Sequence, residues 1–94
     1  MKKTILLVDD DPDYMFQMKI RAEHFGFEVV TADSQREAEK MFETFKPDLA
    51  IFDLMMENED SGFILSYKIK KKYPDVPVIL ATAVTAETGL SFNL

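Results

Sequence analysis

The stretch TILLVDDDPD, residues 4–13, passes abruptly from apolar residues to four carboxylates and a proline. A continuous apolar run that is rich in branched side chains predicts a strand buried on both faces. Pro12 suits the first turn of a helix, and Asp11 before it is a favoured N-cap residue. The stretch therefore predicts a strand, an acidic turn and a helix, in that order.

The acidic turn would lie at the carboxyl end of the predicted strand. In open α/β sheets, ligands bind in the crevice beyond the carboxyl ends of the strands. Several carboxylates held there repel one another and would favour a cation. The alternative is that Asp11 and Asp13 cap the helix while Asp9 and Asp10 are merely solvated. This alternative explains Asp11 well. It does not explain Asp9 and Asp10, because burying unpaired acids at a strand end costs free energy. We therefore favour a binding site.

The composition limits the classes of protein to which the chain can belong. The chain has 94 residues, enough for one domain, and 47% of them are hydrophobic and 30% charged. A net charge of −6 argues against a nucleic-acid-binding surface, and the lack of cysteine excludes disulfides and thiolate metal sites. No window approaches the roughly 20 apolar residues of a membrane span, and no signal peptide is recognisable. We expect a cytoplasmic protein without direct nucleic-acid or membrane partners.

Strand and helix patterns alternate along the rest of the chain. We expect helices over residues 12–25, from the capping box Ser34–Glu37 onward, and over 62–72, and strands over residues 27–32, 49–53 and 75–83. The last of these strands reads as buried. Single helices between successive strands predict a parallel sheet with right-handed crossovers and helices on both faces.

The inner faces of the helices are predicted from apolar residues at helical spacing. These residues are Met15, Met18, Ala22 and Phe25 in the first helix, Ala38, Met41, Phe42 and Phe45 in the second, and Leu65 and Ile69 in the third. We expect Gly26 to end the first helix. The only histidine, His24, is predicted to be a surface residue, and Lys70, Lys71 and Lys72 a solvated run that complements the helix dipole.

The strand ends bring a set of polar residues to one edge of the predicted sheet. They are Asp9 and Asp10, Asp53, and Thr82. Three carboxylates without Cys or His form a hard oxygen site, which suits Mg²⁺. A carboxylate is also a possible nucleophile toward a phosphoryl group, so Asp53 could form an aspartyl-phosphate. The Thr82 hydroxyl could donate a hydrogen bond to the phosphoryl oxygens.

Three segments carry a resemblance to a known family: ILLVDDDP at residues 5–12, LAIFDLMM at 49–56 and PVILATA at 77–83. Together they resemble the receiver domain of bacterial two-component response regulators, and the match covers essentially the whole chain in order and spacing. The resemblance implies a flavodoxin-like, doubly wound parallel α/β sheet with strand order 2-1-3-4, which a fifth strand normally extends.

The resemblance also implies roles for individual residues. Asp53 would be the phosphoacceptor for a sensor histidine kinase. Asp10 would bind Mg²⁺ directly, Asp9 directly or through water, and the backbone carbonyl of Met55 would be a further ligand. Thr82 would be the switch hydroxyl that turns toward the phosphoryl group.

The chain departs from the family in two places. Residues 57–62 replace a proline-containing turn with a slightly longer acidic loop, in which Glu57 or Glu59 could alter the metal site, although a solvated loop is the simpler interpretation. No Lys or Arg follows Lys72, so the family's fifth strand, with its lysine, is missing. We therefore expect residues 1–94 to be a C-terminally truncated receiver domain, a fragment of a longer regulator. Residues 78–82 would form a bare apolar edge, which favours self-association.

The leading hypothesis is a Mg²⁺-dependent phosphoacceptor domain that acts as a signalling switch, not an enzyme. The first alternative is a receiver-like interaction module that works without phosphorylation. The second is a Mg²⁺-dependent phosphohydrolase, for which no general base is visible beyond the acids themselves.

Overall fold

Four strands and three helices alternate in the computed structural model, which describes residues 2–53 and 61–81. In chain order they are β1 (Thr4–Val8), α1 (Pro12–His24), β2 (Glu28–Ala32), α2 (Gln35–Thr44), β3 (Leu49–Asp53), α3 (Ser61–Lys72) and β4 (Val78–Ala81). The strands form one parallel sheet in the order β2-β1-β3-β4. The predicted fold class and strand order are therefore confirmed.

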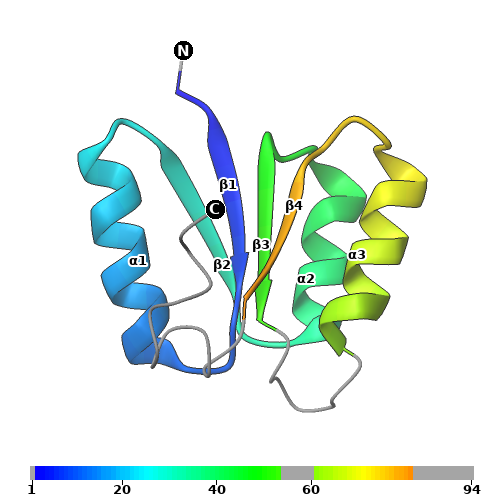
Figure 1. Cartoon of the computed structure of the whole chain (residues 1–94), viewed down its shortest axis with the longest axis horizontal. Coiled ribbons are helices and arrows are strands. Elements are labelled where there is room, and N and C mark those ends of the chain that lie inside the picture. The colour runs from blue at the N-terminus through cyan, green and yellow to red at the C-terminus, as the bar shows by residue number, and fades with distance from the viewer. Residues whose placement is uncertain (1, 54–60, 82–94) are drawn as a thin grey trace.

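The sheet separates two hydrophobic cores, with α1 on one face and α2 and α3 on the other (Figure 1). Because successive strand residues point to opposite faces, β1 contributes to both. Leu6 and Val8 pack in the core under α2 and α3, whereas Ile5 and Leu7 pack with Met15 of α1. The central strand is thus buried on both faces, as its continuous apolar sequence predicts.

The register of β1 sets the level at which the neighbouring strands end. Val8 pairs with Ala32 of β2 and with Phe52 of β3. One residue further on, the N–H of Asp9 still donates to the Ala32 carbonyl at 3.1 Å. The residues that follow Val8 and Phe52, which are Asp9 and Asp53, consequently leave the sheet side by side.

Helix α1 starts at the acidic turn as predicted. Asp11 is the N-cap residue, and its side chain accepts hydrogen bonds from the N–H groups of Asp13 at 3.0 Å and Tyr14 at 3.2 Å. Pro12 occupies the first helical position, where its missing N–H costs nothing. This cap fixes the direction in which the helix leaves the sheet edge.

The end of α1 corrects one core prediction. Phe25 is the C-cap residue and is 78% exposed, whereas helical spacing predicts it on the inner face. Helical spacing no longer applies there, because the chain turns at Gly26, which has a φ of 92°. Phe27, on the far side of this turn, packs against the α1 core instead.

Helices α2 and α3 cover the other face. The predicted capping box is present in part: the N–H of Glu37 donates to Ser34 Oγ at 3.1 Å, while Glu37 Oε1 accepts from the N–H of Asp33. The predicted inner residues Leu65 and Ile69 of α3 are fully buried. Helix α2 is therefore held by its cap as well as by packing, and α3 packs through these buried residues.

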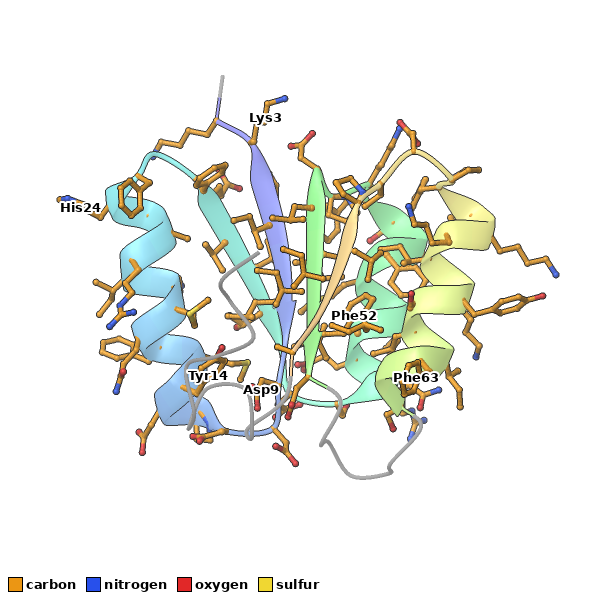
Figure 2. All side chains as sticks on the ribbon, in the orientation of Figure 1. Lys3, Asp9, Tyr14, His24, Phe52 and Phe63 are labelled. Atoms are coloured by element: carbon orange, nitrogen blue, oxygen red, sulfur yellow. The ribbon has the colours of Figure 1, made fainter. Side chains whose placement is uncertain are left out.

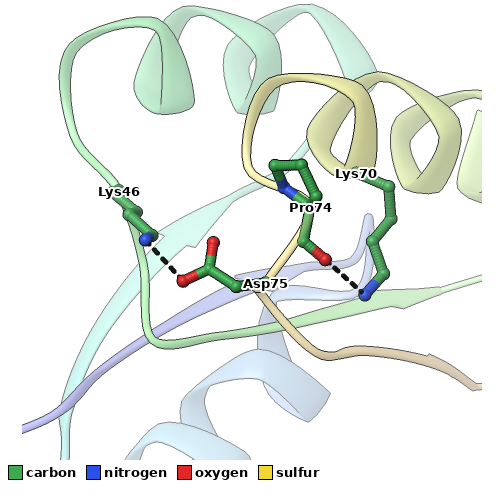
Figure 3. A network of polar contacts seen from close by, with 4 residues as sticks. All are labelled: Lys46, Lys70, Pro74 and Asp75. Carbon is green, nitrogen blue, oxygen red and sulfur yellow. Dashed lines mark hydrogen bonds and ion pairs between the residues drawn. The ribbon is translucent and has the colours of Figure 1, made fainter.

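An ion pair and a hydrogen bond lie at the amino end of the sheet. Lys46 Nζ and Asp75 Oδ2 form an ion pair at 2.7 Å, and Lys70 Nζ donates to the Pro74 carbonyl at 3.5 Å (Figure 3). The hydrogen bond from Lys46 lowers the pKa of Asp75. Since both side chains are exposed, solvent screens this pair and it contributes little stability.

Strand β4 corrects a second prediction. Residues 75–83 read as a buried strand, but the observed strand is Val78–Ala81, and Ile79 and Leu80 are 46% and 36% exposed. In the described part of the chain, β4 pairs only with β3 and is an outer strand, so its side chains lack neighbours on one side. This outer position agrees, for the described residues, with the apolar edge expected from the strand order 2-1-3-4, although the apolar run itself reads like that of a buried central strand.

The core assignment predicts different costs for truncating two isoleucines that both lie in helices. Ile69 is fully buried and Ile20 is 50% exposed. We expect Ile69→Ala to lower the free energy of unfolding by about 2–5 kcal/mol. The matched Ile20→Ala variant should change it by less than about 1 kcal/mol. Urea denaturation measures both, and equal losses would contradict the assignment.

Candidate functional site

Three carboxylates lie together at the carboxyl edge of the sheet. Asp9, Asp10 and Asp53 each offer one oxygen, and these oxygens all lie within 4.8 Å of one another. Asp9 and Asp10 follow β1, and Asp53 is the last residue of β3. The parallel pairing of β1 and β3 thus produces the cluster.

The three acids differ in their surroundings. Asp9 is buried, with 7% of its surface exposed, Asp53 is half-buried and Asp10 is exposed. Asp9 Oδ1 accepts a hydrogen bond from the N–H of Asp11 at 2.9 Å. This short side chain to backbone bond holds the Asp9 carboxylate at the strand end.

Burial is the main reason why the pKa of Asp9 rises from 3.8 to about 6. The charge of Asp53, a side-chain hydrogen bond with Asp53 and the charge of Asp10 raise it further, whereas the Asp11 N–H opposes the shift. Without a cation, the cluster therefore favours one retained proton. A small divalent cation with oxygen preference, such as Mg²⁺, fits the same donor set and would replace that proton.

Tyr14 belongs to the surroundings of the cluster, although the sequence analysis did not single it out. Its side chain is half-buried in the first turn of α1. Burial raises the pKa of the phenol above 10.0, and the charges of Asp9 and Asp53 add to the increase, while Arg21 opposes it. Its place just after the acidic turn was the available signal, because helical side chains lean back toward the helix N-terminus.

The structure brings together Asp9, Asp10 and Asp53, as expected from the strand ends. Their roles as metal ligands and phosphoacceptor stay predictions. Thr82 and Met55 lie outside the described residues, and so does the acidic loop with Glu57 and Glu59.

Capping accounts for Asp11, but it does not account for the buried Asp9. His24, which was predicted to be a surface residue, is exposed. None of the helices in the described ranges is both long and apolar enough to cross a bilayer.

Comparison with known proteins identifies the family. The sequence profile described as "Response regulator receiver domain" matches residues 5–91. The transcriptional regulatory protein GlrR of Escherichia coli K12 is 42% identical over 79 residues, which cover 84% of this chain and 18% of GlrR. The alkaline phosphatase synthesis transcriptional regulatory protein PhoP of Bacillus subtilis is 33% identical over 87 residues, which cover 93% of this chain and 36% of PhoP. The chain thus spans well under half of these relatives.

Solved structures agree with the sequence match. The response regulator TrrA of Thermotoga maritima in complex with Mg²⁺-BeF superposes with a TM-score of 0.80 at 33% identity, covering 94% of this chain and 76% of TrrA. A complex of the histidine kinase ThkA with TrrA matches with a TM-score of 0.77 at 36% identity, covering 86% of this chain and 69% of the matched chain. Sequence, strand order and the acidic cluster agree, and the chain belongs to the response regulator receiver domain family.

Proposed function

We propose that this receiver domain accepts a phosphoryl group on Asp53 from the phosphohistidine of a sensor histidine kinase, in a Mg²⁺-dependent reaction, and so acts as a signalling switch. The observation that carries the proposal is the cluster of Asp9, Asp10 and Asp53 at the carboxyl edge of the sheet. The relatives support it, since TrrA has been solved with Mg²⁺-BeF and in complex with the kinase ThkA.

In the proposed reaction, an oxygen of the Asp53 carboxylate attacks the phosphorus atom. The phosphorus–nitrogen bond to the donor histidine breaks, the imidazole leaves and takes up a proton, and an acyl phosphate remains on Asp53. Asp53 is anionic, the phosphoryl group is anionic, and Asp9 and Asp10 add negative charge beside them. Mutual repulsion therefore opposes the approach unless the charge is compensated.

Asp9, Asp10 and Asp53 are the side chains that would hold Mg²⁺, with the backbone carbonyl of Met55 as a further ligand. When bound, Mg²⁺ neutralises the carboxylates and the incoming phosphoryl oxygens. The hydrogen bond from the Asp11 N–H orients Asp9 for this task.

Phosphorylation would add about −1.5 to −2 charges at the strand end, by analogy with phosphate esters. We propose that the Thr82 hydroxyl turns toward this charge and so couples it to the rest of the domain. Because the sequence has no Lys or Arg after Lys72, acceptance would not depend on a lysine from residues 73–94. The proposed activity is self-modification of a signalling domain and not turnover of an external substrate. A cytoplasmic location, where kinase and regulator would meet, is part of the same proposal.

We further propose that β4 mediates self-association. Ile79 and Leu80 are consecutive, so they project from opposite faces of the sheet, and both are partly exposed. The strand Val78–Ala81 contains no charged residue that would discourage edge pairing. A second copy that pairs its own β4 across a two-fold axis would satisfy this edge and close the assembly as a dimer.

Incubation with acetyl phosphate and Mg²⁺ tests the phosphoacceptor. We expect the intact mass of the wild-type chain to rise by one phosphoryl group, because Asp53 provides the nucleophile. Asp53→Asn should show no gain. Asp33→Asn is the matched control, since Asp33 also follows a strand end but is not part of the acidic cluster, and it should behave as wild type. A folded wild-type chain without any gain would instead favour a phosphorylation-independent module.

The raised pKa of Asp9 predicts a pH dependence in Mg²⁺-free buffer. The folded state keeps this proton up to about pH 6, whereas the unfolded chain loses it near 3.8. The free energy of unfolding should therefore fall as the pH rises from about 4 to about 7, by on the order of 2 kcal/mol. Saturating Mg²⁺, which binds the ionised form, should abolish the fall, and so should Asp9→Asn. Urea denaturation at several pH values would contradict the assignment if stability rose with pH in all samples.

Light scattering tests the proposed dimer. We expect the apparent mass of the wild-type chain to increase with concentration, because β4 pairs between copies. Ile79→Lys should shift the chain toward monomer by placing a charge on the edge. Phe16→Lys, a matched change at a residue on α1 that is 64% exposed, should leave association unchanged. A wild-type monomer at all concentrations would refute the proposed dimer.

A further inference from the structure

We propose that the hydroxyl of Tyr14 donates a hydrogen bond to the phosphoryl group on Asp53, which makes Tyr14 a phosphoryl-binding residue of the phosphoacceptor site. The inference rests on the proposed function, because it requires a phosphoryl group at Asp53. Helix α1 would then contribute a side chain to the site, in addition to starting directly after the acidic turn.

The position of Tyr14 in α1 directs its side chain toward the cluster. Asp11 caps the helix and accepts a hydrogen bond from the Tyr14 N–H at 3.2 Å, which places Tyr14 in the first turn. Helical side chains lean toward the N-terminal end of their helix. For Tyr14, this direction leads back to the turn that carries Asp9 and Asp10. Figure 2 shows Tyr14 and Asp9 at the same end of the molecule.

The neighbours of Tyr14 show which side of α1 it occupies. Met15 is buried against the sheet, and Phe16 and Lys19 line a surface hollow together with Thr31 of β2. Successive helical residues are about 100° apart, so Tyr14 and Phe16 lie on opposite flanks of Met15. Because β2 is the outer strand on the Phe16 flank, the Tyr14 flank faces β1 and β3, whose ends carry Asp9 and Asp53.

Electrostatics agree with this placement. The charges of both Asp9 and Asp53 reach the phenol, and together with burial they keep it protonated. A protonated phenol is a hydrogen-bond donor, whereas ionised carboxylates only accept. Among the described side chains around the cluster, Tyr14 thus supplies a donor that the three acids lack once they are ionised. A phosphoryl group, which brings additional acceptor oxygens, is the ligand that this donor suits.

Beryllium fluoride added to the Mg²⁺-loaded chain is a suitable probe, since it is a non-reactive phosphoryl analogue and TrrA has been solved with Mg²⁺-BeF. We expect Tyr14→Phe to weaken beryllium fluoride binding about fivefold, which is the effect of losing one neutral hydrogen bond. Its Mg²⁺ affinity and urea midpoint should stay at the wild-type values. Fluorine NMR reports the binding in every variant.

Tyrosine fluorescence gives a second readout that a purely structural role would not produce. The chain has three tyrosines and no tryptophan, so tyrosine emission is directly visible. We expect beryllium fluoride to change the emission of the wild-type chain and of the control Tyr67→Phe, in which an exposed residue of α3 is replaced. Tyr14→Phe should lose this change. The wild-type measurement does not depend on the folding of any variant.

Unchanged beryllium fluoride affinity in Tyr14→Phe would overturn the inference. So would equal losses of Mg²⁺ and beryllium fluoride affinity, because these would indicate a structural role. If the wild-type chain bound no beryllium fluoride, or if Asp53→Asn bound it equally well, the proposed function itself would fail and this inference with it.

Discussion

The parallel pairing of β1 with β3 is the constraint on which the candidate site depends. Because Val8 lies opposite Phe52, the residues that follow them leave the sheet at the same level. A shift of one residue would turn every side chain of β1 to the other face. Leu6 and Val8 would then leave the core under α2 and α3, and the cluster would be lost with the packing. The geometry of the acids is therefore fixed by the hydrophobic cores on both sides of the sheet.

This arrangement brings the carboxylates of Asp9, Asp10 and Asp53 close together, although their mutual repulsion lowers the stability of the fold. The raised pKa of Asp9 reflects that conflict, since the buried carboxyl is stabilised in its protonated form. Local bonds limit the cost: the Asp11 N–H donates to Asp9, while Asp11 itself caps α1. Sequences depart from local physical preference mainly at functional sites, and the interactions around such sites compensate. The unfavourable charges thus agree with a site that is built to receive a cation.

The features of the fold that depend on local sequence pattern could be predicted from the sequence, whereas those that depend on neighbouring elements could not. The apolar runs that end at Asp9 and Asp53 indicated both strands and the meeting of their acids, because strand ends in a parallel sheet share one edge. The position of Phe25 was wrong because the helix ends one residue earlier. The burial of β4 was overestimated from its apolar run, although the expected strand order already placed this strand at the edge of the sheet. Tyr14 was missed because helical periodicity alone does not show which flank of α1 faces β1 and β3, and the effect of the Asp53 charge on its phenol arises only in the folded chain.

The distribution of charge along the sheet bears on how a phosphoryl group would be compensated. Lys46, Lys70 and Lys72 lie around the amino ends of β3 and β4, where they bond to Asp75 and to the backbone carbonyls of Pro74 and Glu43. The acids lie at the opposite end of strands such as β3, which has five residues and is therefore about 17 Å long. That span is roughly twice the Debye length of about 8 Å in physiological salt, so these lysines are screened from the cluster. These three lysines therefore compensate the cluster only weakly, whereas the described residues around it offer oxygen ligands that suit a divalent cation and, as proposed, the hydroxyl donor of Tyr14.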